Sequence, residues 1–419
     1  MTSEERSRSD VSRRAVLRGV AAGGAGSLLA AGTVAGGQPD GKIVGTESKA
    51  AVDAAKGKAD SVRHVLDFGD IGQAVAGRFS EQALENLRKR DDVRYVEEDG
   101  TMHAIDDPGK DAPGGEPGPP GDGGGGGDSS ECLPWGVDRT DAEAAAANGD
   151  DGSGADIAII DTGIDSDHPD LQANLGSGTA FVKCRGGSCN TSWDDDEGHG
   201  THCAGITGAV DANGEGVQGV APGVTLHAVK VLDKRGSGSF SDVAAGIEYT
   251  ADQGWDVGSM SLGASSGSQT VKDACTYAQD NGVLLVAAAG NSGPCTDCVG
   301  YPAAYSDVVA VSSTTKSDAL SDFSSTGTEV EIAAPGSNVY STYVDGAYET
   351  LSGTSMACPH ASGAGGVLMA GGSTNIQARD TLTSSAEDLG LSSNEQGAGL
   401  LDVAAALGHD SSDDGTGTC

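Results

Sequence analysis

The segment LSGTSMACPHASG, residues 351–363, places one serine, Ser355, among small residues. Gly353 permits a strained turn, Thr354 is suited to cap a helix, and Pro359 is tolerated near a helix start. The pattern therefore predicts Ser355 at a helix N-terminus, where free backbone N–H groups favour negative charge. Such a position suits a hydroxyl that attacks a carbonyl group. The alternative interpretation is a small-residue helix packed tightly on its neighbour.

Two further segments carry groups that could assist such a hydroxyl. In IAIIDTGID, Asp161 ends an apolar run typical of a buried strand, where a carboxylate is costly without a partner. In DDDEGHGTHCAG, His199 lies between two glycines at the start of an expected helix. Histidine titrates near neutrality and can transfer a proton. Taken singly, each has a plainer interpretation, as a buried turn-capping aspartate and a loop histidine.

The three segments together, in the order Asp, His, Ser, resemble the subtilisin-like serine peptidases from Glu131 to about His409. The resemblance implies that Ser355 is the nucleophile, His199 the general base and then acid, and Asp161 the group that orients the imidazole. It also implies that Asn291, in LLVAAAGNSG, is the side-chain oxyanion donor, with the Ser355 N–H as its companion. The acidic composition and an export signal make the chain most similar to the halolysins, which haloarchaea secrete.

The same resemblance implies where a peptide substrate binds. An outer strand would pair with the extended peptide, an S4 residue would follow it, and small residues would line the S1 pocket and admit large apolar P1 side chains. Gly236, Ser237 and Gly238 match the outer strand, and Phe240 matches the S4 region. Ser261, Leu262 and Gly263 match one wall of the S1 pocket, Ala289 and Gly290 match the other wall, and Gly300 matches its floor. A tight turn is the alternative interpretation for each glycine.

A structural calcium ion is implied at one loop, with no catalytic cofactor. Oxygen ligands suit calcium, and the residues that match are Asp170, Asn213 and the carbonyls of Val210 and Val217. The loop AVDANGEGVQGV has one residue more than the subtilisin pattern. For the run Asp194–Asp196, a solvated charge run is favoured over a second ion.

Nine cysteines fit an oxidising compartment, and the odd number leaves at least one thiol unpaired. Cys184 and Cys189 could close a small disulfide loop, and a structural role is favoured for the C-x-x-C at Cys295 and Cys298. The pairing of Cys132, Cys275 and Cys419 stays open. Cys203 and Cys358 lie near the expected catalytic residues, but neither holds the position of the nucleophile. They are therefore interpreted as buried free thiols, not as parts of a Cys–His protease.

Short apolar runs alternate with expected helices after Glu131, which predicts an α/β fold: a mostly parallel sheet with helices on both faces. The runs are ADIAIID, TLHAVKVL, VGSMSL, GVLLVAAAG and DVVAVSS, and the helices are expected near 200–209, 242–253 and 270–281. Functional groups then belong at the carboxyl ends of the strands.

The N-terminal part divides into three expected segments. Arg13-Arg14 before an Ala/Gly-rich run predict a twin-arginine signal peptide at 1–37. Residues 38–106 predict a small α+β unit with a helix near 80–90, similar to the inhibitor-type propeptide of these peptidases. Residues 107–130 are a Gly/Pro-rich linker in which the precursor would cleave itself, and the peptidase domain at 131–409 precedes an acidic tail at 410–419.

The net charge of −37, from 62 acidic and 25 basic residues, predicts a high-salt habitat. At about 1 M salt the Debye length is about 3 Å, so self-repulsion is screened; an acidic mesophile protein is the alternative. With so few basic residues, neither nucleic acid nor an anionic membrane is an expected partner. The expected partners are protein and peptide substrates and the chain's own propeptide, and a monomer is expected.

The sequence as a whole predicts a secreted, halophilic, self-processing serine endopeptidase of broad specificity. One rival is a catalytically silent member that serves as a surface binding or scaffold protein; the filled positions Asp161, His199, Ser355 and Asn291 argue against it. A second rival is an esterase, which would cleave small esters and not casein. The G-x-S-x-G motif of α/β-hydrolases is absent at Ser355.

Overall fold

The computed structural model describes residues 41–105, 131–185, 189–411 and 417–419. The signal peptide expected at 1–37, the linker expected at 107–130 and half of the acidic tail lie outside the described residues.

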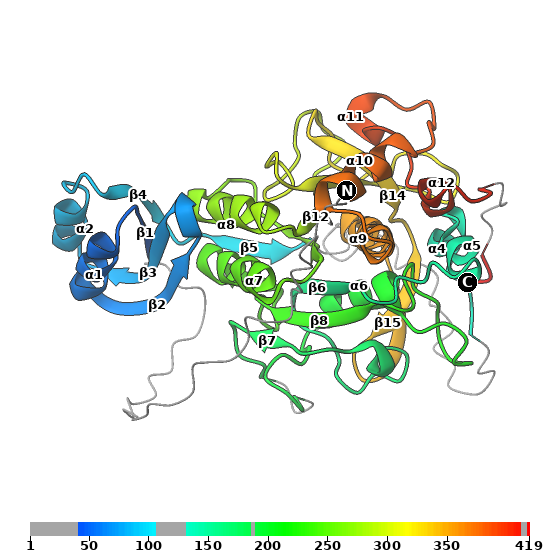
Figure 1. The fold of residues 1–419 in the computed structure, drawn as a ribbon, viewed down its shortest axis with the longest axis horizontal. Coiled ribbons are helices and arrows are strands. Elements are labelled where there is room, and N and C mark those ends of the chain that lie inside the picture. The colour runs from blue at the N-terminus through cyan, green and yellow to red at the C-terminus, as the bar shows by residue number, and fades with distance from the viewer. Residues whose placement is uncertain (1–40, 106–130, 186–188, 412–416) are drawn as a thin grey trace, which may run out of the picture. The chain divides into compact units, whose positions relative to one another are not determined.

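A parallel sheet forms the centre of the described peptidase region (Figure 1). Its strand order is β14-β13-β12-β10-β6-β8-β7, and every neighbouring pair is parallel. The strands are β6 (Asp156–Asp161), β7 (Thr179–Ala180), β8 (Thr225–Lys230), β10 (Val257–Met260), β12 (Leu284–Ala288), β13 (Val309–Thr314) and β14 (Val330–Pro335). The predicted α/β class and the five strand segments are confirmed. Strands β7 and β14 were not anticipated from the sequence.

The sheet is buried on both faces, and this explains why its strands are nearly continuous apolar runs. In β6, Ile157 and Ile159 belong to one buried core, whereas Ala158 and Ile160 belong to another. The first core lies under α6 (His199–Gly208) and α9 (Thr354–Ala370), and the second under α7 (Phe240–Gln253) and α8 (Gln269–Asp280).

Local signals set the helix starts within two residues of the expected positions. Ser239 caps α7 in a capping box with Asp242, and the helix stops at Gly254, which has a left-handed φ of 69°. Ser268 caps α8, its side chain accepting a hydrogen bond from the N–H of Val271.

Residues 41–105, here called the N-terminal module, form the expected small α+β unit. Its antiparallel sheet has the order β2-β3-β1-β4, and its two helices pack a separate core around Val44 and Leu84. The elements are β1 (Lys42–Thr46), α1 (Lys49–Lys58), β2 (Ala59–Asp67), the 3-10 turn η1 (Gly69–Ile71), β3 (Gln73–Phe79), α2 (Glu81–Leu87) and β4 (Val93–Glu98).

The last strand of the module belongs to a different sheet. β5 (Thr101–Ala104) lies between β9 (Ser237–Ser239) and β11 (Leu262–Gly263) and pairs antiparallel with both. The end of the module is therefore hydrogen-bonded to two segments of the peptidase region.

The remaining elements surround the sheet. They are a hairpin of β15 (Val339–Tyr343) and β16 (Ala347–Leu351), the short helices α4 (Trp135–Arg139), α5 (Ala142–Ala147), η2 (Gln172–Asn174), α11 (Ser393–Gln396) and α12 (Val403–Leu407), and α10 (Asn375–Ser384). Within the described part of the chain, no helix combines the length and the apolar character needed to cross a bilayer.

Candidate active site

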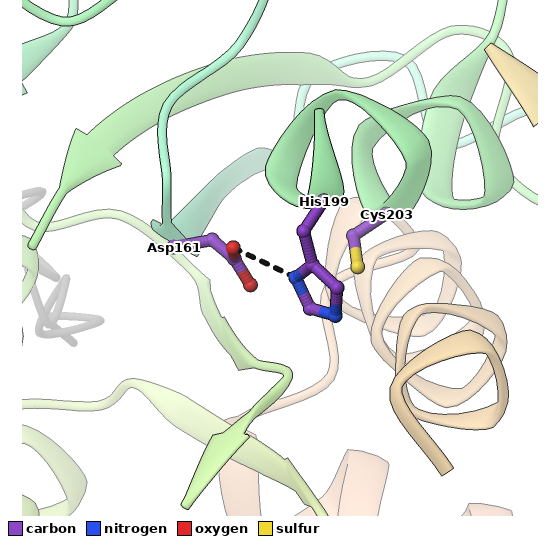
Figure 2. A group of neighbouring side chains, drawn as sticks. All are labelled: Asp161, His199 and Cys203. Atoms are coloured by element: carbon purple, nitrogen blue, oxygen red, sulfur yellow. Dashed lines mark hydrogen bonds and ion pairs between the residues drawn. The ribbon is translucent and has the colours of Figure 1, made fainter. Parts of the chain in front are cut away.

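Asp161 is the last residue of β6, at the carboxyl edge of the sheet, and is 1 % exposed. Its Oδ1 accepts a hydrogen bond from the N–H of Thr162 at 2.7 Å and another from Nδ1 of His199 at 2.8 Å (Figure 2). One oxygen of the buried carboxylate thus has two partners, whereas Oδ2 is buried without a hydrogen-bond partner among the described residues. A carboxylate at Nδ1 fixes the imidazole so that Nε2 is available as the proton-accepting atom.

His199 is the first residue of α6, as the sequence predicts. Gly198 caps the helix with φ 120°, and a Cβ there would lie 2.3 Å from the ring of Tyr343, so only glycine fits. The carboxylate of Glu197 accepts a hydrogen bond from the N–H of His199 at 2.8 Å. Burial raises the pKa of Glu197.

The run Asp194–Asp196 is not a solvated charge run, so that expectation was wrong. Asp194 and Asp195 are 2 % and 4 % exposed. Asp195 accepts hydrogen bonds from the N–H groups of Gly198 and Thr201, both at 2.9 Å, and so satisfies free donors at the start of α6. These carboxylates build the turn that presents His199.

Ser355 lies in the first turn of α9 and is fully buried. The helix is capped by Gly353 and not by Thr354, because Gly353 has φ 157° and the hydroxyl of Thr354 bonds elsewhere. The Ser355 Oγ lies 2.8 Å from the carbonyl oxygen of Ile105 and 3.2 Å from that of Ser261. Burial of this hydroxyl is thus linked to the end of the N-terminal module.

Cys203 connects the two halves of the site. It follows His199 by one turn of α6, and one ligand atom each of Asp161, His199 and Cys203 lie within 4.8 Å of one another (Figure 2). The Sγ of Cys203 also donates a hydrogen bond of 3.5 Å to the carbonyl oxygen of Ser355. The pair of Asp161 and His199 is therefore linked through Cys203 to the main chain of Ser355, so three different elements converge here.

Asn291 follows β12 and lies beside the start of α9. Its Oδ1 accepts hydrogen bonds from the N–H and the hydroxyl of Thr354, at 2.9 and 3.0 Å. A Cβ at Gly353 would lie 3.0 Å from Nδ2 of Asn291, 3.5 Å from the Ile105 carbonyl oxygen and 3.6 Å from the Ser355 nitrogen. Because Gly353 has no side chain, Nδ2 of Asn291, the nitrogen of Ser355 and the carbonyl oxygen of Ile105 all border the same small space.

The expected substrate strands hold the module's own chain as a peptide. Met102 pairs with Gly238 and His103 with Ser237, while Ala104 pairs with Leu262 on the other side. At the end of the strand, the N–H of Ala104 donates to the carbonyl of Gly236 at 2.8 Å, and that of the next residue, Ile105, donates to the carbonyl of Ser261 at 3.2 Å.

The residues expected to form the S1 and S4 pockets are next to this strand. A Cβ at Gly263 would lie 3.3 Å from Cδ1 of Ile105, and the N–H of Gly300 donates to the carbonyl of Ala289 at 2.9 Å. A Cβ on Gly290 would lie 3.9 Å from the nitrogen of Gly300, so these small residues share one wall. Phe240, which is 6 % exposed, donates its N–H to the carbonyl of Gly100.

The residues expected to bind calcium lie together, but Asn213, Val210 and Val217 face Asp170 with N–H groups and not with the expected amide and carbonyl oxygens. Asp170 is fully buried, and its carboxylate accepts hydrogen bonds from Nδ2 of Asn213 at 2.7 Å and from the N–H of Val217 at 2.8 Å. The carbonyl of Asp170 accepts from the N–H of Val210 at 3.0 Å. Burial raises the pKa of Asp170.

Glu131 contacts this loop from a distant part of the chain, and the sequence analysis did not anticipate it. Its two carboxylate oxygens accept hydrogen bonds from the N–H groups of Ala212 and Gly214, at 2.8 and 3.1 Å. Its position directly before a cysteine gives no local signal, because the contact depends on chain that lies about eighty residues later.

Three disulfides resolve most of the cysteine expectations. Cys184–Cys189 and Cys295–Cys298 form as expected, and Cys132 pairs with Cys419, a link that the sequence left open. Cys203, Cys275 and Cys358 are free and buried, and burial raises the pKa of all three thiols. The expectation of buried free thiols at Cys203 and Cys358 is confirmed, and neutral thiols are poor nucleophiles.

Comparison with known proteins agrees with this geometry. The model of the subtilase family matches residues 152–399. Subtilisin E of Bacillus subtilis is 39 % identical over 337 residues, which cover 80 % of each chain. Subtilisin DY of Bacillus licheniformis is 43 % identical over 281 residues, 66 % of this chain and 99 % of the relative, and thermitase of Thermoactinomyces vulgaris is 45 % identical over 239 residues, 57 % of this chain and 83 % of the relative.

Proposed function

The chain belongs to the subtilase family, whose members are serine endopeptidases, and on this premise we propose that it hydrolyses peptide bonds through an acyl-enzyme on Ser355. One observation carries the proposal. Strand β5 is paired on both sides, and the carbonyl oxygen of the next residue, Ile105, lies 2.8 Å from the Ser355 hydroxyl. A hydroxyl beside a bound peptide carbonyl is the starting arrangement for acyl transfer.

In the proposed mechanism, Ser355 Oγ attacks the carbonyl carbon while His199 Nε2 takes the hydroxyl proton. The carboxylate of Asp161, which is hydrogen-bonded to Nδ1 of His199 at 2.8 Å, stabilises the imidazolium that forms. The oxyanion receives hydrogen bonds from Nδ2 of Asn291 and the N–H of Ser355. His199 then protonates the departing amine, the C–N bond breaks, and water activated by His199 hydrolyses the ester to release the acid and Ser355.

Substrates are proposed to bind as extended strands between Gly236–Gly238 and Ser261–Gly263, as β5 does. Because main-chain hydrogen bonds supply the pairing, one cleft accepts many sequences, which supports broad specificity. The side chain of Ile105 against Gly263 supports apolar P1 residues. Casein hydrolysis at high salt by the wild type, without hydrolysis by Ser355→Ala, tests the assignment.

We further propose that the N-terminal module is the inhibitory propeptide of a precursor that cleaves itself. Two of its carboxylates support this role, because Glu97 accepts hydrogen bonds from the N–H groups of Gln269 and Thr270 and Asp99 accepts one from that of Ser241, at the starts of α8 and α7. Negative charge at a helix N-terminus is favourable. The module is thus bound to the peptidase region by these carboxylates as well as by the pairing of β5 with β9 and β11.

The proposed cleavage bond is Ile105–Asp106. Composition alone suggested cleavage between Asp107 and Glu131, in a linker outside the described residues. The contact between Ile105 and Ser355 favours a bond just before that linker.

A structural calcium ion is proposed at the loop of Asp170. The carboxylates of Asp170 and Glu131 and the amide oxygen of Asn213 could serve as oxygen ligands. Two carboxylates at one loop fit a hard cation such as calcium. The Asn213 Oδ1 accepts the N–H of Glu215 at 2.7 Å, so turning this oxygen toward an ion would break that hydrogen bond. The ion would supply charge balance and rigidity, and no catalytic step depends on it.

The enzyme is proposed to be secreted and to work at high salt. The net charge of −37 supports this, because screening relieves self-repulsion. Export by the twin-arginine route rests on residues 1–37, which lie outside the described residues.

A further inference from the structure

We propose that Lys230 is a positioning residue of the catalytic centre. Through the main-chain carbonyl of Thr162, it fixes the Asp161 carboxylate against His199. This inference rests on the function proposed above, because it assigns Lys230 a role in that same site. Lys230 does not touch substrate in this role and acts through Thr162.

The burial of Lys230 is exceptional among the lysines of the peptidase region. Lys230 is completely buried, whereas the other lysines between Glu131 and Cys419 are all exposed. Those exposed lysines are Lys183, Lys234, Lys272 and Lys316. Removing an ammonium group from water is costly, so a buried lysine needs partners that hold it in one geometry.

Lys230 has two such partners. Its Nζ donates to Oδ1 of Asp196 over 2.6 Å and also to the carbonyl oxygen of Thr162. The Asp196 side chain is 2 % exposed, and its other oxygen accepts the N–H of Arg185 at 2.6 Å. The ion pair is therefore hydrogen-bonded to the main chain at both ends, at Thr162 and at Arg185.

Thr162 joins this ion pair to both catalytic partners. Its N–H donates to Oδ1 of Asp161 at 2.7 Å, the oxygen that also receives His199. Its Oγ1 accepts the N–H of Gly200, the residue after His199, at 2.8 Å. Its carbonyl receives Lys230. A shift of Thr162 would therefore disturb both ends of the hydrogen bond between Asp161 and His199.

The sheet places Lys230 for this role. In the parallel pairing of β6 with β8, Lys230 is the partner of Asp161. The N–H groups of the next two residues, Val231 and Leu232, donate to the Asp161 carbonyl at 2.9 and 3.1 Å. The main chain after β8 is therefore hydrogen-bonded to Asp161 at the end of β6, and the Lys230 side chain is hydrogen-bonded to the next residue, Thr162.

If the ion pair only stabilises the fold, its removal should affect stability alone; if it also positions Asp161, its removal should affect catalysis as well. Replacing only Lys230 leaves the buried carboxylate of Asp196 without its cation, and an unpaired buried charge lowers the stability of the folded state whatever the role of the pair. Replacing both removes the unpaired charge, but the Thr162 carbonyl still lacks its donor. A double variant therefore separates charge balance from positioning.

The test compares Lys230→Met, Asp196→Asn and the double variant K230M/D196N with Lys234→Met, a matched change of an exposed lysine four residues later. We expect the double variant to regain most of the thermal stability that Lys230→Met loses. Its kcat should remain about 10- to 100-fold below that of the wild type, with KM within about twofold. Lys234→Met should keep the wild-type kcat. A double variant with wild-type kcat, or an equal loss in Lys234→Met, would overturn the proposal.

A second readout does not need activity. In full-length Ser355→Ala chains, the proton on Nδ1 of His199 should give a low-field NMR resonance, because it lies in a hydrogen bond to a carboxylate. The resonance should shift or vanish when K230M/D196N is added and stay in place with Lys234→Met. An unchanged resonance in all three chains would refute positioning by Lys230. If the wild type hydrolyses no peptide, the proposed function fails, and this resonance still decides the role of Lys230.

Discussion

The hydroxyl of Ser355 lies 2.8 Å from the carbonyl oxygen of Ile105, a residue 250 positions earlier in the chain. This contact joins the end of the N-terminal module to the first turn of α9. The strand that leads to Ile105 lies between β9 and β11, where the proposed function places an extended substrate, and this arrangement is the one expected of an uncleaved precursor.

The Ile105–Ser355 contact predicts where and how the chain is cut. Wild-type chain kept at high salt should shorten between Ile105 and Asp106, whereas Ser355→Ala should stay full length, because the attacking hydroxyl is absent. N-terminal sequencing and intact mass measure both results. Ser306→Ala, a change of an exposed serine, should be cut like the wild type. Shortening of Ser355→Ala in the absence of other proteases would refute self-processing.

Asn291 is predicted to stabilise the transition state more than the bound substrate. Asn291→Ala should lower kcat about 10²–10³-fold with little change in KM, because an oxyanion donor acts where negative charge develops. Steady-state kinetics on a peptide substrate measure the effect, with the exposed Asn281→Ala as control. An unchanged kcat would remove Asn291 from the mechanism.

The Asp170 loop is predicted to make thermal stability depend on calcium. A chelator should lower the midpoint of thermal unfolding, because an ion at about 100 times its Kd contributes about 2.7 kcal/mol to the folded state. The double variant Glu131→Gln with Asp170→Asn should lose the response to added calcium, whereas the exposed Asp280→Asn should keep it. Equal responses in all chains would place the ion elsewhere.

Glu248 is predicted to make the precursor less stable as the pH rises. On α7, its carboxylate accepts the N–H of Asp67 at 2.7 Å, and burial raises the pKa of Glu248 to about 7 from the usual 4.5. The stabilising contribution of a carboxyl with a raised pKa is complete below the unfolded pKa and is lost as the pH rises through the folded pKa. That loss falls between about pH 4.5 and about pH 7.

In the full-length Ser355→Ala background, adding Glu248→Gln should therefore reduce the drop in thermal midpoint between about pH 5 and pH 8. Thermal unfolding followed by circular dichroism at fixed salt measures the drop. Two chains whose midpoints change in parallel with pH would contradict the assignment.

Local sequence signals were sufficient for most of the central fold. The strand ending at Asp161 and the helix starting at His199 follow from an apolar run and from glycines beside a polar cluster, and both lie where expected. Such signals depend on residues close in sequence. The resemblance in three motifs then allowed Ser355 to be grouped with them before any contact was known.

Contacts between distant segments could not be predicted in this way. The link of Cys132 to Cys419 and the contact of Ile105 with Ser355 join residues 287 and 250 positions apart. Asp195 shows a second cause of failure, because its burial depends on N–H donors of a helix start that composition does not reveal. A run of acidic residues in an acidic chain looks solvated until those donors are located.

The central claim is that Ser355 is a nucleophile activated by the pair of Asp161 and His199. Labelling of the processed enzyme by a serine-directed fluorophosphonate, with the modified residue located by mass spectrometry, tests it most directly. We expect one label per chain, on Ser355, and none in Ser355→Ala or in denatured enzyme. A processed, folded enzyme that takes up no label, or that carries the label on another residue, would contradict it.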